Sequence, residues 1–322
     1  MHQKGKTLTT ILQSPPHLEF FIGIDGGGTK TMGLLADQAG QILGKAESGA
    51  SNYHAVGEEQ TKKVLYDVVS RLISDASASL ESCTCCLGLA GVTSSVGRHV
   101  IGRICDEIGL PGNRILTHDA QIALIGGAEE LSGVIIIAGT GSIVYGINAA
   151  GQETQAGGWG HLLGDEGSGY DIARRAFQAV ARATDGRGDP TLLSSLMLDA
   201  LEFSQSRNLI PWMHSVGKDQ VAQFAGVVFN AANSNDPVAQ RILDESADEL
   251  MLAARVVVDK LRFSQPFNLV LSGGIFTHQP TFVESMRSRL RNFSPHARVC
   301  LPKHEPAHGA VVLAMSQQCR SR

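Results

Sequence analysis

Hydrophobic residues in this chain fall into short β-branched runs that end on glycine and longer runs with helical spacing. One continuous run starts at Phe20 and ends in the glycine-rich turn 26–30, after which a second apolar run leaves the turn. The same plan returns over 134–148, with a turn at 139–142. Because β-branched residues favour strands and glycine turns reverse the chain, each copy predicts a β-hairpin.

Alternating strands and helices follow each predicted hairpin. Apolar residues spaced three or four apart indicate helices, and short apolar runs between turn residues indicate strands. In the first half we expect strands at 20–26, 32–36, 41–46, 85–90 and 114–117, and helices at 58–73 and 96–108. In the second half we expect strands within 134–148, after 152, at 268–271 and at 298–301, and helices at 169–183, 190–203, 220–232, 237–261 and from 307. This alternation predicts an α/β fold with an internal repeat, divided between residues 119 and 131.

Composition and charge narrow the class of protein. With 322 residues, of which 43% are hydrophobic and 18% charged, the chain is long enough for two domains. A formal net charge of −4 and the lack of a Lys/Arg run argue against nucleic acid or an anionic membrane as a partner. No segment approaches the roughly 20 apolar residues of a membrane span, and the apolar patch within residues 1–19 is too short and polar for a signal-peptide core. We therefore expect a cytoplasmic protein with a loose N-terminal extension over 1–19.

Three of the six cysteines, Cys83, Cys85 and Cys86, lie within a strand-like apolar run. This placement favours buried, reduced thiols over a disulfide framework. A zinc site is the alternative, but no second Cys or His pair follows at ligand spacing, so we set it aside.

The two glycine turns are candidate phosphate-binding sites. Turns of Gly, Thr and Ser expose backbone N–H groups that no Cβ atom shields, and such groups bind anions. The first turn is not a P-loop, because Lys30 follows Thr29 rather than glycine and a strand comes next; neither turn has the dinucleotide pattern G-x-G-x-x-G. The alternative for each is a plain hairpin turn, but the pair favours two halves that close on one phosphate chain. The candidate phosphate-binding residues are Gly26, Gly27, Gly28, Thr29, Lys30, Gly139, Thr140, Gly141 and Ser142.

Two aspartates stand where phosphoryl transfer needs carboxylates. Asp25 precedes the first glycine turn, where Mg²⁺, bound directly or through water, would reconcile a carboxylate with bound phosphates; alternatively Asp25 caps its own turn. Asp119 follows the strand 114–117, at the edge where open α/β sheets place ligand chemistry. We expect Asp119 to accept the proton of an attacking hydroxyl, and the alternative is a helix N-cap.

The glycine-rich segment 157–170 carries Trp159, His161, Asp165 and Glu166. An aromatic wall with polar groups suits a sugar ring and its hydroxyls. The alternative is a structural loop whose acidic residues complement the next helix, and we expect His161 to be structural.

Two weaker candidates complete the set. Asn52 lies in a polar loop before the first long helix, where it is either a turn residue or a sugar contact. Gly273 and Gly274 follow the strand 268–271, where glycine lets a nucleotide base approach the backbone.

Five of these segments also carry a resemblance to a known family. In chain order they are 24–30 (IDGGGTK), 116–120 (LTHDA), 138–142 (AGTGS), 157–161 (GGWGH) and 164–168 (GDEGS). They resemble the N-acetylglucosamine kinases of the BadF/BadG/BcrA/BcrD-type ATPase family over about residues 20–314. The resemblance implies two ribonuclease-H-like domains of the actin-like ATPase type around a central cleft. It also implies ATP as phosphoryl donor, Mg²⁺ as cofactor, closure on the sugar and a homodimer.

Carried over to this sequence, the resemblance implies a role for each candidate. Both glycine turns hold the ATP phosphates, Asp25 lies near the metal and Asp119 is the base. The implied sugar-binding residues are Asn52, Asp119, Gly158, Trp159 and Asp165, and the implied adenosine-binding residues are Gly273 and Gly274. The implied domains are 20–122 and 123–306, with a helix over 307–322 that returns to the first domain. The segment 185–217 matches nothing in the resemblance, and the zinc-binding Cys motif of repressor-type sugar kinases is missing.

These observations predict an ATP-dependent kinase that phosphorylates the 6-hydroxyl of N-acetyl-D-glucosamine and releases N-acetylglucosamine 6-phosphate and ADP. Glucosamine and N-acetylmuramic acid are the alternative sugars, and the lactyl carboxylate of the latter calls for a cation. From a different class, the alternative is an ATPase that activates a reductase or dehydratase and has no sugar substrate.

Overall fold

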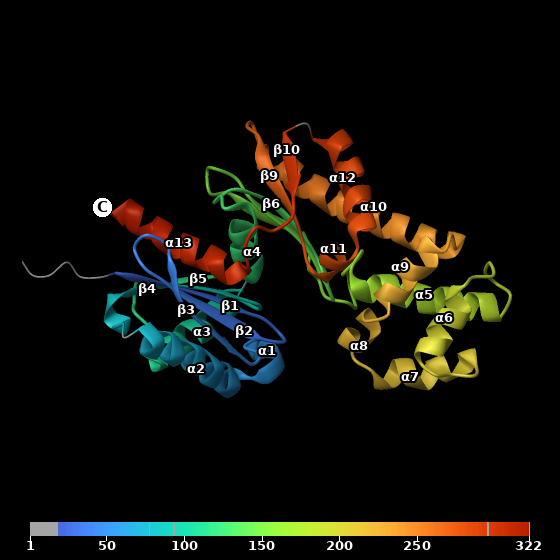
Figure 1. The fold of residues 1–322 in the computed structure, drawn as a ribbon, viewed down its shortest axis with the longest axis horizontal. Coiled ribbons are helices and arrows are strands. Elements are labelled where there is room, and N and C mark those ends of the chain that lie inside the picture. The colour runs from blue at the N-terminus through green and yellow to red at the C-terminus, as the bar shows by residue number, and fades with distance from the viewer. Residues whose placement is uncertain (1–18, 77, 93, 295, 322) are drawn as a thin grey trace, which may run out of the picture.

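The computed structural model describes residues 19–76, 78–92, 94–294 and 296–321. Apart from Glu19, the predicted N-terminal extension lies outside these residues. The described part forms two α/β units, each built on a five-stranded sheet (Figure 1). The sheet orders are β3-β2-β1-β4-β5 and β10-β9-β6-β7-β8. In both, a hairpin and a third antiparallel strand are joined by two strands parallel to the first, so the predicted internal repeat is confirmed at the level of topology.

The element bounds follow the predicted pattern closely. The first unit contains β1 (Phe20–Gly26), β2 (Thr31–Ala36), β3 (Ile42–Ser48), α1 (Tyr53–Val56), α2 (Glu58–Ala76), η1 (Leu80–Ser82), β4 (Cys83–Leu89), α3 (Ser95–Glu107), β5 (Ile115–Thr117) and α4 (Asp119–Ala128). The second contains β6 (Gly133–Ala138), β7 (Ser142–Ile147), β8 (Glu153–Gly157), α5 (Gly169–Thr184), α6 (Leu193–Ala200), η2 (Ser206–Asn208), α7 (Leu209–Ser215), α8 (Lys218–Ala222), α9 (Ala225–Asn233), α10 (Pro237–Leu261), β9 (Phe267–Ser272), α11 (Gly274–His278), α12 (Pro280–Phe293) and β10 (Ala297–Cys300). The chain then enters α13 (Pro306–Ser321).

Both faces of the first sheet are buried, and β1 illustrates how. Ile22 and Ile24 point into the core formed with α2 and α3, whereas Phe21 points into the core formed with α13. Because side chains alternate across a strand, a continuous apolar run is what a strand covered on both faces requires. At Gly23, a Cβ atom would lie 2.5 Å from the Val311 backbone nitrogen, so α13 rests directly on β1.

Helix α4 joins the two units and is apolar around its whole circumference. Ile122 packs into the α13 core of the first sheet, and Leu124 packs against Ile135 and Tyr145 of the second. The layers therefore run from α2 and α3 through the first sheet, α13 and α4, and the second sheet to the large helical layer that contains α5 and α10 (Figure 1). Among the described residues, no helix combines the length and apolar character that crossing a membrane requires.

Two predicted helices differ in the structure. The helix expected over 190–203 is confined to α6, because Asp236 Oδ2 accepts a hydrogen bond from the Leu192 nitrogen at 2.7 Å and fixes the segment before it. The helix expected over 220–232 is split into α8 and α9. Phe224, at the break, packs its ring between Phe177 and Trp212, a tertiary contact with no local sequence signal.

The predicted burial of the cysteine cluster is confirmed. Cys83, Cys85 and Cys86 lie buried on β4 as free thiols. Burial raises the pKa of the Cys83 thiol to about 11 and that of Cys86 to about 12, which keeps both protonated and unreactive.

Candidate active site

The first glycine turn connects β1 to β2. Gly26 pairs with Thr31, and the Gly27 nitrogen donates to the Lys30 carbonyl at 3.0 Å. The Gly27 carbonyl in turn accepts from the nitrogens of Ser51, at 3.1 Å, and Asn52, at 3.2 Å. The chain before α1 is thereby held against the turn.

The structure therefore brings Asn52 beside the first turn. Its Oδ1 atom accepts a hydrogen bond from the His54 nitrogen at 3.1 Å and caps α1. The side chain is half-buried. Asn52 is therefore a turn residue beside the first glycine turn, and its contact with a sugar stays a prediction.

The second glycine turn connects β6 to β7 and is docked onto helix α5. Ala138 pairs with Ser142 across the turn. The Gly139 carbonyl accepts from the Gly169 nitrogen at 2.8 Å, and the Thr140 carbonyl accepts from the Tyr170 nitrogen at 3.3 Å. The start of α5 and the turn are thus one structural unit.

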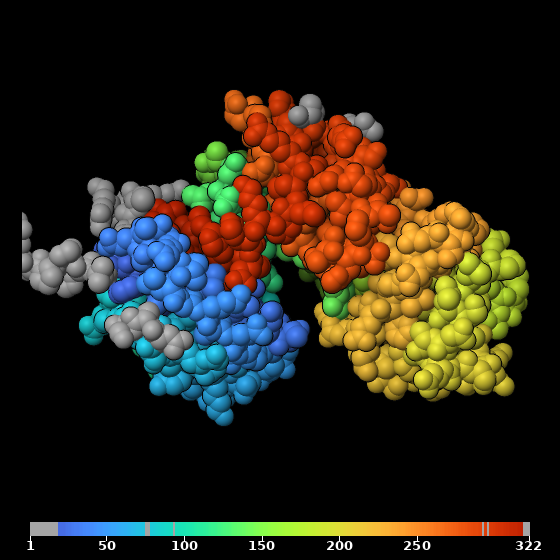
Figure 2. Space-filling view, in the orientation of Figure 1, coloured from blue at the N-terminus to red at the C-terminus, as the bar shows by residue number. Residues whose placement is uncertain are grey.

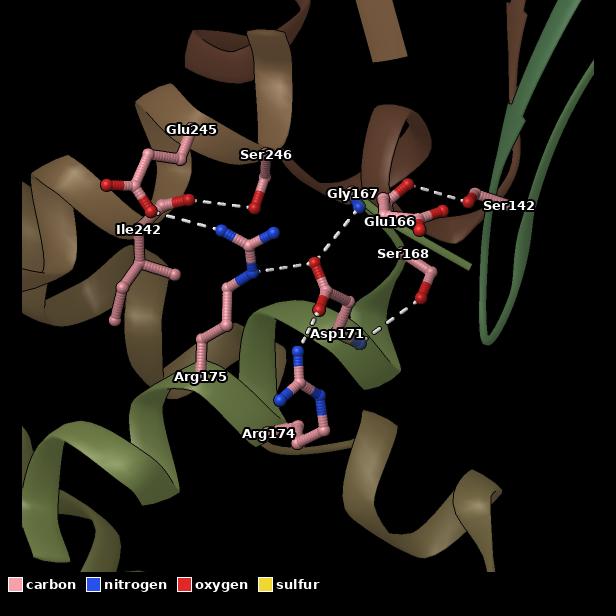
Figure 3. Close-up of polar contacts among 10 residues, drawn as sticks. All are labelled: Ser142, Glu166, Gly167, Ser168, Asp171, Arg174, Arg175, Ile242, Glu245 and Ser246. Carbon is pink, nitrogen blue, oxygen red and sulfur yellow. Dashed lines mark hydrogen bonds and ion pairs between the residues drawn. The ribbon is translucent and has the colours of Figure 1, made fainter. Parts of the chain in front are cut away.

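Asp165 is placed against this second turn. It is 4% exposed, has a left-handed φ of 63°, and its Oδ1 accepts a hydrogen bond from the Ser142 nitrogen at 3.3 Å. The Ser142 hydroxyl donates to the Glu166 carbonyl at 2.7 Å (Figure 3). The segment predicted to contact the sugar therefore packs against the second glycine turn and supports it.

Gly141→Ala should lower the apparent melting temperature and weaken ATP binding. An added Cβ would lie 2.9 Å from Asp165 Oδ2, so the carboxylate and the turn must separate. Overpacking of this kind typically costs about 1–3 kcal/mol. Thermal unfolding without ligand and calorimetric titration with ATP measure the two effects. Gly139→Ala is the matched control, since its Cβ meets no atom closer than 4.0 Å; equal melting temperatures for the two variants would contradict the prediction.

One cleft is lined by residues of both glycine turns. Its volume is about 530 Å³. It is lined by Thr29 from the first turn, by Gly139 and Thr140 from the second, and by Gly274 after β9. The surface is visibly hollowed between the first unit and the helices of the second (Figure 2). The structure thus brings together four candidates that are far apart in the sequence.

The cleft also contains residues that sequence reasoning missed. They come from α8, α9, α11 and the residues that directly follow α8 and α11: Asp219, Ala222, Gln223, Ala225, Gly226, Phe229, Ile275, His278 and Gln279. The only local signal was a helical period, which marks the buried face of a helix and says nothing about a ligand on its other side.

Gly273 and Gly274 have different structural requirements. Gly273 has a φ of 102°, and a Cβ there would overlap the Ala138 carbonyl group, so glycine is needed for packing at the second turn. A Cβ at Gly274 would meet open space. Gly274 is therefore the position of the pair at which a ligand can approach the backbone.

Asp25 and Asp119 are close enough for the charge of Asp119 to affect the pKa of Asp25. Burial raises the pKa of Asp25 from 3.8 to about 7, with a further rise from the Asp119 charge and an opposing effect from Lys30. Asp119 is exposed at the start of α4, and its Oδ1 accepts from the Ala120 nitrogen at 2.9 Å. Asp119 is the first residue of the helix and His118 is the N-cap, so the cap interpretation of Asp119 does not describe its position.

This pair of carboxylates fits a divalent cation. Among the described residues, no three His, Cys, Asp or Glu side chains gather as a metal site. Mg²⁺ needs fewer, because it is held by one or two carboxylates while water and phosphate oxygens complete its shell. A buried carboxylate whose ionisation is opposed by a second one is stabilised by a cation. Asp25 is the residue that would hold it.

The metal-free protein should lose stability as pH rises from 5 to 7. The pKa of Asp25 is higher in the folded protein than in the unfolded chain, so the unfolded chain loses this proton at lower pH. The free energy of unfolding should therefore fall by about 2 kcal/mol between pH 5 and 7. Asp25→Asn removes this term, so its stability should fall less. Urea unfolding at several pH values, without Mg²⁺ or nucleotide, measures the slope. Asp259→Asn, at an exposed position on α10, should keep the wild-type slope; an unchanged slope in Asp25→Asn would refute the assignment.

His118, which precedes the proposed base, connects it to the second sheet. The imidazole is buried and lies edge-on to Tyr145 at 4.4 Å between ring centroids. The Tyr145 hydroxyl donates to Glu153 at 2.8 Å, and Glu153 lies 3.7 Å from His118 Nε2. Burial lowers the pKa of His118, which favours the neutral ring. The start of α4 is thereby packed against β7 and β8.

Trp159 lies on a groove next to the second turn. It is 74% exposed and shares a groove of about 250 Å³ with Ile143, Glu166, Leu252 and Val256. Gly158 before it has a φ of 73°, which suits glycine. The structure thus places Trp159 against β7 and α10.

The chain is similar to known proteins over nearly its whole length. The model of the BadF/BadG/BcrA/BcrD ATPase family matches residues 22–314. The N-acetylmuramic acid/N-acetylglucosamine kinase of Clostridium acetobutylicum is 35% identical over 304 residues, covering 93% of this chain and 99% of that protein. The N-acetyl-D-glucosamine kinase of Dictyostelium discoideum is 32% identical over 315 residues, with the same two coverages.

A solved structure has the same fold. It belongs to a candidate N-acetylglucosamine kinase from Chromobacterium violaceum, which is 28% identical, has a TM-score of 0.75, and is matched over 93% of this chain and 100% of its own. Together with the repeated sheet topology, this similarity confirms the two-domain actin-like ATPase fold. The chain therefore belongs to the BadF/BadG/BcrA/BcrD ATPase family.

Proposed function

We propose that this protein is an ATP-dependent kinase that transfers the γ-phosphoryl group to the 6-hydroxyl of N-acetyl-D-glucosamine. The observation that supports this most directly is the cleft lined by both glycine turns. Asp25 directly precedes the first of these turns, and the charge of Asp119 acts on it. The names of the two relatives at 35% and 32% identity agree with this substrate.

Each group in the site has a defined part in the proposed reaction. The exposed backbone of the two turns binds and aligns the phosphates, and Gly274 admits the adenosine. Mg²⁺ held by Asp25 would neutralise phosphate charge. Asp119 accepts the proton of the sugar 6-hydroxyl as the hydroxyl oxygen attacks the γ-phosphorus and ADP leaves. Positioning and electrostatics supply most of the rate enhancement in such transfers.

The remaining assignments follow the same proposal. Asn52, Gly158, Trp159 and Asp165 form the sugar side of the site once the cleft closes, and closure excludes water that would hydrolyse ATP. We assign residues 20–122 and α13 to one domain and residues 123–306 to the other. We further propose that the protein is a cytoplasmic homodimer. Light scattering on the purified protein tests the oligomeric state.

A coupled ADP-release assay with a panel of sugars tests the function. N-acetylglucosamine should give the highest kcat/KM among N-acetylglucosamine, glucosamine, N-acetylmuramic acid, N-acetylmannosamine and glucose. A preference for another hexosamine would correct the substrate and keep the reaction. No sugar-dependent ADP release would instead favour an ATPase activator of a reductase or dehydratase.

N-acetylmuramic acid is the second candidate substrate, because the Clostridium relative is named for both sugars. Its lactyl carboxylate needs a cation. Lys30 lies in the first glycine turn and forms an exposed pair with Glu47 at 3.2 Å. Arg98 donates to the Val92 carbonyl at 3.3 Å, and its charge acts on His118, next to Asp119.

Arg98→Gln should therefore lower kcat/KM for N-acetylmuramic acid about tenfold, the usual effect of losing one charge-assisted hydrogen bond. The value for N-acetylglucosamine should stay within about twofold, because that sugar carries no carboxylate. Steady-state kinetics with both sugars make the comparison. A parallel loss for both sugars would show that Arg98 acts on the base or on folding instead.

A further inference from the structure

The second unit contains an arginine-lined cavity that shares no lining residue with the nucleotide cleft. Its volume is about 470 Å³, and it lies between α5, α10 and the segment that follows α5. Its lining includes five arginines and two acidic residues: Arg174, Arg175, Arg182, Arg187, Arg241, Asp189 and Glu245. Every cation of the cavity is an arginine. Part of the wall comes from 185–217, the segment that the proposed function leaves unexplained.

The arginines at the mouth of the cavity are held weakly. Arg187 pairs with Asp185 at 2.6 Å and Arg241 pairs with Asp189 at 3.1 Å, but both pairs are exposed. Arg182 donates to the Arg187 carbonyl at 3.4 Å. Exposed ion pairs contribute little, so these guanidinium groups can exchange their partners for a stronger ligand at small cost.

Two arginines of the cavity, Arg174 and Arg175, bind Asp171, which in turn contacts the loop that packs against the second glycine turn. Arg174 and Arg175 lie 2.7 and 2.9 Å from the two carboxylate oxygens of Asp171, which is 3% exposed. The same carboxylate accepts from the Gly167 nitrogen at 3.2 Å. Figure 3 shows Asp171 between the guanidinium groups on one side and the loop that carries Gly167 and Ser168 on the other.

We propose that this cavity binds a small anion that carries at least two phosphate groups. Guanidinium groups bind phosphate oxygens in a bidentate manner, and a ligand with two phosphates carries more negative charge than each exposed carboxylate that it would replace. We propose two phosphates rather than one because three exposed cations line the cavity from different segments: Arg182 from α5, Arg187 from the segment after it, and Arg241 from α10. The site is additional to the proposed kinase site and does not depend on which sugar is phosphorylated.

Hydrogen exchange with inorganic pyrophosphate as the probe tests the site directly. In the wild-type protein without nucleotide, millimolar pyrophosphate should slow exchange in peptides that cover 182–189, and its half-saturation concentration is read from those peptides alone. In Arg182→Gln/Arg241→Gln this concentration should rise about tenfold or more. Inorganic phosphate should need a higher concentration than pyrophosphate.

The controls separate this site from the nucleotide cleft and from unfolding. Arg291→Gln, at an exposed position on α12 outside the cavity, should keep the wild-type half-saturation. ADP binding and the melting temperature of the double variant should match those of the wild type. An absence of protection over 182–189 in the wild-type protein, or equal protection in the folded double variant, would overturn the proposal whether or not the kinase assay succeeds.

Discussion

Asp119→Asn should lower kcat with the preferred sugar by about 10²- to 10⁴-fold, the usual contribution of a general base. An amide cannot accept the hydroxyl proton, yet it has nearly the same shape as the carboxylate. The side chain is exposed at the start of α4 and accepts a hydrogen bond from the Ala120 nitrogen of its own helix, so folding should not require the charge. Stopped-time product analysis at saturating ATP and sugar measures the loss.

Two further measurements on Asp119→Asn separate a loss of catalysis from a loss of binding or folding. ADP affinity and the melting temperature should stay close to wild type, because Asp119 does not line the nucleotide cleft. Asp259→Asn, at an exposed position on α10, should retain full activity. If Asp119→Asn stays folded and keeps near-normal turnover, another group takes the proton and the assignment of the base is wrong.

The sequence predicted the two sheets because the signals that specify them are local. A strand covered on both faces is apolar at every position, as in 21–24, and its hairpin partner begins immediately after a glycine turn. Both turns could therefore be located to the residue. The break at Phe224 and the late start of α6 at Leu193 could not, because they depend on contacts with Trp212 and Asp236, which are distant in sequence.

The sequence pointed to glycine-turn positions that line one cleft, but not to the side-chain contacts around them. A run of Gly, Thr and Ser indicates a tight turn, so Thr29, Gly139 and Gly274 could be identified from the sequence. In the structure these three residues line one cleft. The packing of Asp165 behind the second turn and of His118 against Tyr145 depends on the approach of separate elements. A buried acid and an exposed acid look the same in a sequence, which is why the supporting role of Asp165 was missed.

The two units are joined where glycines of α4 and α13 meet. A Cβ at Gly126 would lie 2.7 Å from the Glu305 carbonyl oxygen, and a Cβ at Gly309 would overlap the Ile122 carbonyl oxygen and lie 3.0 Å from the Gly126 Cα. The helices therefore touch backbone to backbone. Because α13 also rests on β1, this crossing is in contact with the strand that carries Asp25 and leads into the first glycine turn.

Gly309→Ala should lower the free energy of unfolding by about 3 kcal/mol, because the new methyl group forces the two helices apart. Alanine is the better helix former by about 0.5–1 kcal/mol, so the sign itself is informative. Gly226→Ala is the matched control: it is also helical, but its Cβ meets no atom within 4 Å, and we expect it to be neutral or slightly stabilising in the absence of ligand. Urea unfolding of both variants measures the difference. A Gly309→Ala protein as stable as Gly226→Ala would mean that α4 and α13 separate at little cost, and the close crossing would then not be what holds the two units together.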